Sequence, residues 1–204
     1  TIHDAFRGRL LVDEGNVKLG GLRPVYDKLR HADRILITAC GTSWHSGLVG
    51  EYMIEALAGV PVEVEYASEF RYRNPVLKPN DVVFAISQSG ETADTLAAVK
   101  EAKQKGVTVL GIVNVVGSSI ARETEAGVYI HAGPEIGVAS TKAFTSQVTV
   151  LALIALLMGR MKNLSQSEGL KIAKAMTEIP EKIRLILELK DQIRDIALQY
   201  TKVK

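Results

Sequence analysis

The sequence is poor in the residues that mark several specialised classes of protein. It has one cysteine and one tryptophan, and only 5% of its residues are aromatic. A single cysteine cannot form a disulfide within the chain, which argues against a small secreted domain held by disulfides and favours a reducing compartment. The amino-terminal residues also lack the basic and apolar regions of a signal peptide. We therefore expect a cytoplasmic protein.

An excess of one charge and long apolar runs are also missing. The formal net charge is only +2, so the chain has no basic field of the size that nucleic acid requires. The longest apolar run, Val148–Met158, is interrupted by Thr149 and falls well short of the ~20 residues of a membrane span. We expect a buried helix there, and neither nucleic acid nor a membrane as a partner.

What the sequence does have is an alternation of strand-like and helix-like segments. Its 204 residues are 47% hydrophobic, which suits one large domain with a sizeable core. Alternating strands and helices indicate right-handed crossovers and a parallel α/β sheet. We predict strands at Arg34–Ala39, Val62–Tyr66, Asp81–Ser87, Val107–Val113 and Gly127–His131, and helices at Leu22–His31, Ser46–Ala58, Thr92–Lys105 and Ser140–Gly159.

The two ends of the chain differ from this central unit, which we place at residues 22–160. Residues 1–21 are rich in glycine and lack a sustained apolar period, so we expect an interdomain connector that need not pack well. Residues 161–204 are expected to form further helices on the domain or on a partner, with a new helix starting at Pro180. They carry an apolar stripe, for which packing within the chain is our preferred interpretation: Ile172, Met176, Ile179, Ile183, Ile186, Ile193, Ala197 and Tyr200.

Two predicted junctions between strand and helix, Cys40–Ser43 and Ser87–Thr92, are rich in small hydroxyl residues and glycine. Hydroxyls and the amides of a helix amino end are donors for phosphate, and Gly90 would let the backbone approach it. The alternative is a set of caps that serve only their own helices. A strand order of 2-1-3-4-5 would bring both junctions to one switch point. We therefore predict one pocket for a phosphorylated small molecule.

A third segment, Glu135–Lys142, could close this pocket. Glu135 could act as an acid or base on a sugar carbon and Lys142 could neutralise phosphate, although an ion pair or a helix cap is the commoner role for either residue alone. Cys40 has no charged neighbour in the sequence, so we expect a buried thiol and not a nucleophile. We expect no metal and no cofactor.

In order and spacing, four motifs closely resemble the first sugar-isomerase (SIS) module of the glutamine–fructose-6-phosphate aminotransferase family: Cys40–Ser43, Ala67–Tyr72, Ser87–Thr92 and Gly137–Lys142. The resemblance covers nearly the whole chain. It implies a three-layer α/β/α fold around a five-stranded parallel sheet of flavodoxin-like type. It also implies a homodimeric parent enzyme of hexosamine biosynthesis that makes glucosamine 6-phosphate from fructose 6-phosphate and glutamine.

The resemblance further implies which residues bind the sugar phosphate. Matched by position, Ser87, Gln88, Ser89 and Thr92 would hold the phosphate, Thr42 and Ser43 would hold oxygens of the sugar or phosphate, and Val138 would contact the sugar through its backbone.

The chain also departs from the family pattern. The family's enzymes begin with a glutaminase domain, and their second SIS module and carboxyl tail supply the acid–base groups and the Schiff-base lysine. We therefore expect a binding module that is inactive alone and whose partners are the missing modules of the same parent chain. Two alternatives stay open: a self-sufficient phosphosugar isomerase with Glu135 as its base, and a non-catalytic sugar-phosphate sensor. The sensor needs a DNA-binding element, and no helix-turn-helix with a basic face precedes Leu22.

Overall fold

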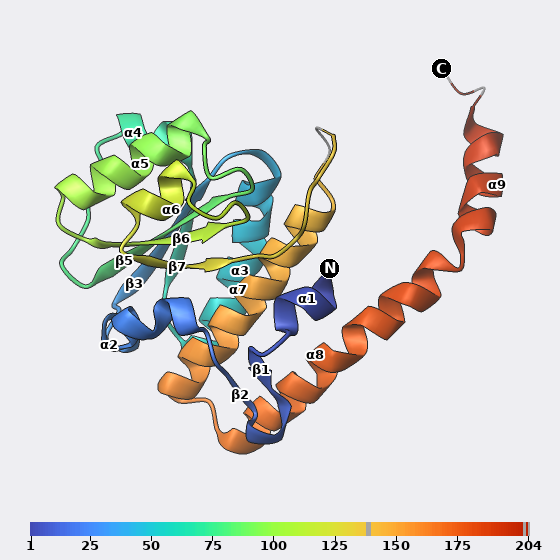
Figure 1. Ribbon diagram of the computed structural model, residues 1–204, viewed down its shortest axis with the longest axis horizontal. Helices are drawn as coiled ribbons and strands as arrows, with labels where there is room; N and C mark the ends of the chain where they lie inside the picture. The colour runs from blue at the N-terminus through green and yellow to red at the C-terminus, as the bar shows by residue number, and fades with distance from the viewer. Residues whose placement is uncertain (138–139, 202, 204) are drawn as a thin grey trace.

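A computed structural model of the chain describes residues 1–137, 140–201 and 203. At its centre lies a parallel sheet of five strands in the order β4-β3-β5-β6-β7, with helices on both faces (Figure 1). This is the flavodoxin-like order that the sequence predicts. The strands are β3 (Arg34–Ala39), β4 (Val62–Tyr66), β5 (Asp81–Ser87), β6 (Thr108–Val113) and β7 (Ala126–Tyr129).

The central strands β3, β5 and β6 are largely apolar because both faces of the sheet are buried there. Successive side chains point to opposite faces, so in β3 Ile35 and Ile37 enter one hydrophobic core while Leu36 enters another. The first core lies beneath α3 (Gly41–Ala58) and α7 (Lys142–Met161), and the second beneath α4 (Ala67–Tyr72), α5 (Ala93–Gln104) and α6 (Ser119–Glu123). The predicted three-layer α/β/α arrangement is confirmed.

The helix α7 is the buried helix expected from the longest apolar run. By length and composition alone it could cross a membrane. However, Val150, Leu153 and Ile154 are fully buried inside the domain. The helix also packs closely on α3, since a Cβ added to Gly50 would lie 3.0 Å from the side chain of Leu151. Packing in the core accounts for the apolar composition of α7.

The first 21 residues pack on the domain, although their sequence pattern does not require it. Ala5, Val17 and Leu19 are buried. The left-handed turn at Gly15 lies against the start of the carboxyl-terminal helices, where a Cβ would sit 2.3 Å from the amide nitrogen of Leu170. A role as interdomain connector stays a prediction. The elements are α1 (Ile2–Phe6), β1 (Leu10–Leu11), η1 (Val12–Glu14), β2 (Asn16–Val17), η2 (Gly20–Val25) and α2 (Tyr26–Arg30).

Beyond α7 the chain forms an arm that leaves the domain (Figure 1). Its first helix, α8 (Gln166–Leu187), begins with a capping box between Ser165 and Glu168 and continues through Pro180. The prediction of a new helix at Pro180 is therefore wrong. The missing amide of a proline removes one helical hydrogen bond, and on an exposed arm water can satisfy the freed carbonyl. The break comes later, before α9 (Lys190–Tyr200).

The apolar stripe of the arm faces the domain along α8 as far as Ile183, which lines a cavity with Ile2 and Lys142. Ile172 and Met176 pack against the first core. Farther along, Ile186 is 58% exposed and Tyr200 is 67% exposed. Packing of the whole stripe within the chain, our preferred interpretation, is thus contradicted for the part of the stripe beyond Ile183.

The close contact at Gly15 predicts a test of the packed amino-terminal segment. Alanine at position 15 must adopt a positive φ and must also force its Cβ against the backbone of Leu170. We expect Gly15→Ala to lower the free energy of unfolding by about 2 to 4 kcal/mol. The matched control is Gly8→Ala, because Gly8 also has a positive φ but has nothing within 4 Å of its Cβ position; it should cost only about 1 to 2 kcal/mol. Equal losses in urea titrations would contradict the packing.

Candidate functional site

Parallel pairing brings the two hydroxyl-rich junctions together at the carboxyl edge of the sheet. β3 pairs with β5 so that Ala39 lies opposite Ile86. Cys40 and Ser87, the residues that follow this pair, therefore lie side by side at this edge. Beyond them the chain turns into α3 after β3 and into α5 after β5. This is the edge at which open α/β sheets bind ligands.

A cavity of about 220 Å³ lies between the junctions. The predicted residues Thr42, Ser43, Gln88, Ser89 and Thr92 all line it, and so do Glu135, Gly137 and Ser140 from the segment before α7.

One of the predicted residues, Ser87, is placed differently. Ser87 is only 2% exposed and is absent from the described wall of the cavity. Val138 falls outside the residues that the structure describes.

The hydroxyl of Ser87 holds the second junction in shape from behind. Ser87 Oγ accepts a hydrogen bond of 3.0 Å from the amide of Gly90 and lies 2.9 Å from Thr92 Oγ1. Gly90 has a φ of +67°, and a Cβ there would lie 2.0 Å from Ser118 Oγ. Glycine is thus required here by its backbone conformation and by Ser118, whatever its role toward a ligand.

The acidic residue of this junction turns away from the cavity. Glu91 Oε1 accepts a hydrogen bond of 2.7 Å from the amide of Ser119, at the start of α6. The amide of Glu91 donates to Ser89 Oγ at 3.1 Å. That bond occupies one lone pair of Ser89 and leaves the hydroxyl hydrogen free for an acceptor in the cavity.

Ser43, on the facing junction, is held by a residue that the sequence analysis missed. Gln147 of α7 is fully buried, and its Nε2 donates to Ser43 Oγ at 2.9 Å. The carbonyl of Ser43 accepts a further hydrogen bond of 2.7 Å from Ser46 Oγ. The only sequence signal for Gln147 is an amide directly before the longest apolar run of the chain.

The amino ends of three helices border the cavity, but they differ in how their amides are satisfied. The N-cap side chains of α3 and α5, Cys40 and Thr92, make no cap hydrogen bond. At α7 the amides of Thr141, Lys142 and Ala143 donate to the carboxylate of Glu135 at 2.7 to 3.2 Å. The amino ends of α3 and α5 are therefore the ones suited to receive an anion.

Glu135 is a cap for α7, the commoner of the two roles that its sequence position allows. Desolvation opposes its ionisation and would raise its pKa, but hydrogen bonds from the amides of Thr141, Lys142 and Ala143 and from Ser140 Oγ outweigh that effect and lower the pKa from 4.5 to about 2. A carboxylate held by this many donors is a poor base near neutral pH.

No basic residue is among the described residues that line the cavity. The Lys142 ammonium donates instead to the carbonyl oxygen of Pro134. Cys40 is half-buried. Its sulfur lies 3.8 Å from Thr95 Oγ1, a neutral group that does not activate a thiol as a nucleophile. Within the described residues, no group of three or more His, Cys, Asp or Glu side chains is placed to hold a metal ion.

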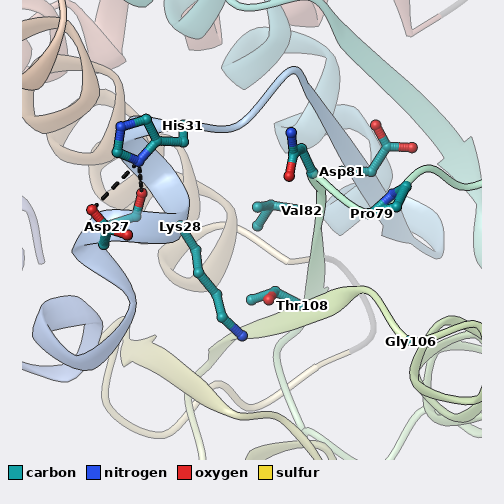
Figure 2. Close-up of a pocket in the computed structure, with 9 residues that line it drawn as sticks. Asp27, Lys28, His31, Pro79, Asp81, Val82, Gly106 and Thr108 are labelled. Atoms are coloured by element: carbon teal, nitrogen blue, oxygen red, sulfur yellow. Dashed lines mark hydrogen bonds and ion pairs between the residues drawn. The ribbon is translucent and has the colours of Figure 1, made fainter.

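A second cavity, of about 270 Å³, lies at the opposite edge of the sheet (Figure 2). Its polar side chains are largely engaged with one another or with neighbours. His31 Nδ1 lies 3.0 Å from the carbonyl oxygen of Asp27, and Lys28 pairs with Glu125 at 2.9 Å. Asp81 pairs with Arg34 at 2.5 Å. This cavity stands at the amino ends of β5 and β6, away from the helix amino ends that favour anions.

Residues 28–157 match the family described as the SIS domain. Over 98% of its length the chain is 57% identical to a glutamine–fructose-6-phosphate aminotransferase (isomerizing) of Chlorobaculum tepidum and 53% identical to one of Bacteroides thetaiotaomicron. It spans about a third of those relatives, 32% and 33% of their lengths. A solved carboxyl-terminal domain of glucosamine-fructose-6-phosphate aminotransferase from Francisella tularensis is 36% identical, with a TM-score of 0.92 over 98% of this chain and 56% of that one.

The cap at α7 predicts a pH-dependent contribution of Glu135 to stability. A folded-state pKa below 4.5 means that the contribution is present above pH 4.5 and is lost as the pH falls toward 2. We expect Glu135→Gln to lower the free energy of unfolding at pH 7 by about 1.5 to 3 kcal/mol. The difference in the free energy of unfolding between this variant and the unmodified chain should become smaller in urea titrations at lower pH. The control is Glu14→Gln, at an exposed glutamate of η1. A difference independent of pH would refute the cap.

Proposed function

We propose that this chain, which belongs to the SIS domain family, binds a sugar phosphate in the cavity between β3 and β5. We further propose that it is the first SIS module of an enzyme that makes glucosamine 6-phosphate from fructose 6-phosphate and glutamine. The observation that carries the first proposal is the meeting of two hydroxyl-rich junctions and two uncapped helix amino ends around one cavity. The similarity to aminotransferases along nearly the whole chain supports the second.

The donors of the cavity suit a phosphate. A phosphate dianion only accepts hydrogen bonds, and Ser43 and Ser89 each have an oxygen lone pair occupied by a donor of the protein. Their hydroxyl hydrogens are therefore available to the ligand. Together with the amides at the start of α3 and α5, they provide several donors without a lysine or arginine.

The charges also favour one orientation of the ligand. Glu135 is ionised near neutral pH, so the phosphate should lie toward α3 and α5 and the sugar toward Glu135 and Ser140. Ser87 would act indirectly by holding Gly90 and Thr92 in place. In this arrangement the chain binds and orients the substrate, and the chemistry of amino transfer belongs to other modules of the parent enzyme.

The structure weakens one of the two alternative functions. A self-sufficient isomerase would need Glu135 as its base, and that carboxylate caps α7 with a pKa of about 2.

The arm supports the proposal of further modules. Its apolar side chains at Ile186, Ile193 and Tyr200 are more than half exposed, which is unusual unless a partner covers them. The Francisella domain extends well beyond the part that this chain matches. We propose that the second SIS module of the parent chain covers the arm. We also propose that the parent enzyme is a cytoplasmic homodimer that does not bind nucleic acid.

Calorimetric titration tests the proposed ligand. We expect glucosamine 6-phosphate to bind and glucosamine to give no detectable heat, because the junctions recognise the phosphate. The double variant Ser89→Ala with Thr92→Ala should weaken binding by at least tenfold, since each lost charge-assisted hydrogen bond costs about 1.5 to 3 kcal/mol.

The matched control removes two hydroxyls elsewhere, as Ser167→Ala with Thr177→Ala on the exposed side of α8. This variant should bind like the unmodified chain. Equal affinity for glucosamine and its phosphate would sink the assignment, and so would undiminished binding by the Ser89 and Thr92 variant.

A further inference from the structure

Gln147 is a polar residue in a place where an apolar one would be expected. It lies on α7 among the residues of the first core, and its side chain is fully buried. Its Nε2 donates to Ser43 Oγ at 2.9 Å, while its Oε1 has no hydrogen-bond partner among the described residues. A buried side-chain amide whose nitrogen is hydrogen-bonded but whose oxygen is not contributes little to folding stability, which points to a role in the site.

The contact with Gln147 determines what Ser43 can offer a ligand. A serine hydroxyl has one hydrogen to donate and two lone pairs to accept with. Because Gln147 occupies one lone pair, the Ser43 hydrogen is left to point elsewhere, and Ser43 lines the cavity. The bond from Ser46 Oγ to the Ser43 carbonyl fixes the backbone at the same residue. Ser43 is thus held as a donor.

We propose that Gln147 is a positioning residue, which orients the Ser43 hydroxyl as a hydrogen-bond donor to the bound sugar phosphate. This rests on the proposed function. Gln147 does not touch the ligand, since it is absent from the described cavity wall, and it acts only through Ser43. Removal of its amide lets the Ser43 hydroxyl rotate and turn lone pairs toward the anion.

A purely structural role of Gln147 gives a different expectation. In that case loss of the hydrogen bond from Gln147 to Ser43, which links α7 to α3, would lower the urea midpoint of Gln147→Leu. Under our proposal, Gln147→Leu keeps the packing and removes an Oε1 that has no partner among the described residues, so the urea midpoint should stay the same or rise. The affinity for the ligand should nevertheless fall.

The test is a double-mutant cycle on the 204-residue chain, with glucosamine 6-phosphate as the probe in calorimetry. We expect Ser43→Ala and Gln147→Leu each to weaken binding, by about tenfold for Ser43→Ala and by no more for Gln147→Leu. The double variant should bind as weakly as Ser43→Ala and no more weakly, because Gln147 has nothing to orient once the hydroxyl is gone. The control is Ser146→Ala, which removes the neighbouring buried hydroxyl on α7 and should leave the affinity unchanged.

The outcomes separate this inference from the proposed function. Independent losses that multiply in the double variant would overturn the positioning role, and so would Gln147→Leu binding as tightly as the unmodified chain. Either result leaves the sugar-phosphate site standing. An unmodified chain that folds but does not bind glucosamine 6-phosphate would overturn both.

Discussion

Parallel pairing between β3 and β5 is the constraint on which the site depends. The two strands lie in register to their last residues, with Ala39 opposite Ile86. Each strand is followed at once by a turn into a helix, so two helix amino ends must lie side by side at one edge of the sheet. The hydroxyl residues in those turns then face a common cavity. The cores on both faces of the sheet hold this pairing in place.

The described lining of the cavity offers hydroxyl groups and helix amino ends, and it includes no basic side chain. Such a site can bind an anion because each donor is fixed before the ligand arrives, so little reorganisation is needed. Three hydrogen bonds hold the donors in place. The Gly90 amide donates to Ser87 Oγ, the Glu91 amide donates to Ser89 Oγ, and the Gln147 side-chain amide donates to Ser43 Oγ. Glu135 is a negatively charged residue in the cavity wall, but its carboxylate accepts hydrogen bonds from the amides at the amino end of α7.

Local patterns in the sequence were enough to predict the sheet and most of the cavity wall. Buried parallel strands are continuous apolar runs, and the hydroxyl-rich junctions come directly after two of them, so strand order brings them together. The missed features depend on contacts between distant residues. Gln147 lies 104 residues from Ser43 in the chain, and nothing local shows that its amide reaches that hydroxyl.

Other predictions fail because the surroundings of a residue outweigh its usual structural preference. The sequence pattern of the first 21 residues does not require packing, yet Gly15 and Gly21 are places where backbones touch. Pro180 suggested the start of a helix, but an exposed arm tolerates a lost hydrogen bond. Ser87 belongs to the junction by sequence, but as the last residue of β5 it is buried beneath the turn.

The central claim is that the phosphate binds where β3 and β5 turn into α3 and α5. Amide chemical shifts of the ¹⁵N-labelled chain, followed during titration with glucosamine 6-phosphate, test it residue by residue. We predict that the largest changes will occur at Thr42, Ser43 and the amides from Ser89 to the first turn of α5. Changes centred instead on Lys28, His31 and Thr108, which line the cavity at the opposite edge, would contradict the account.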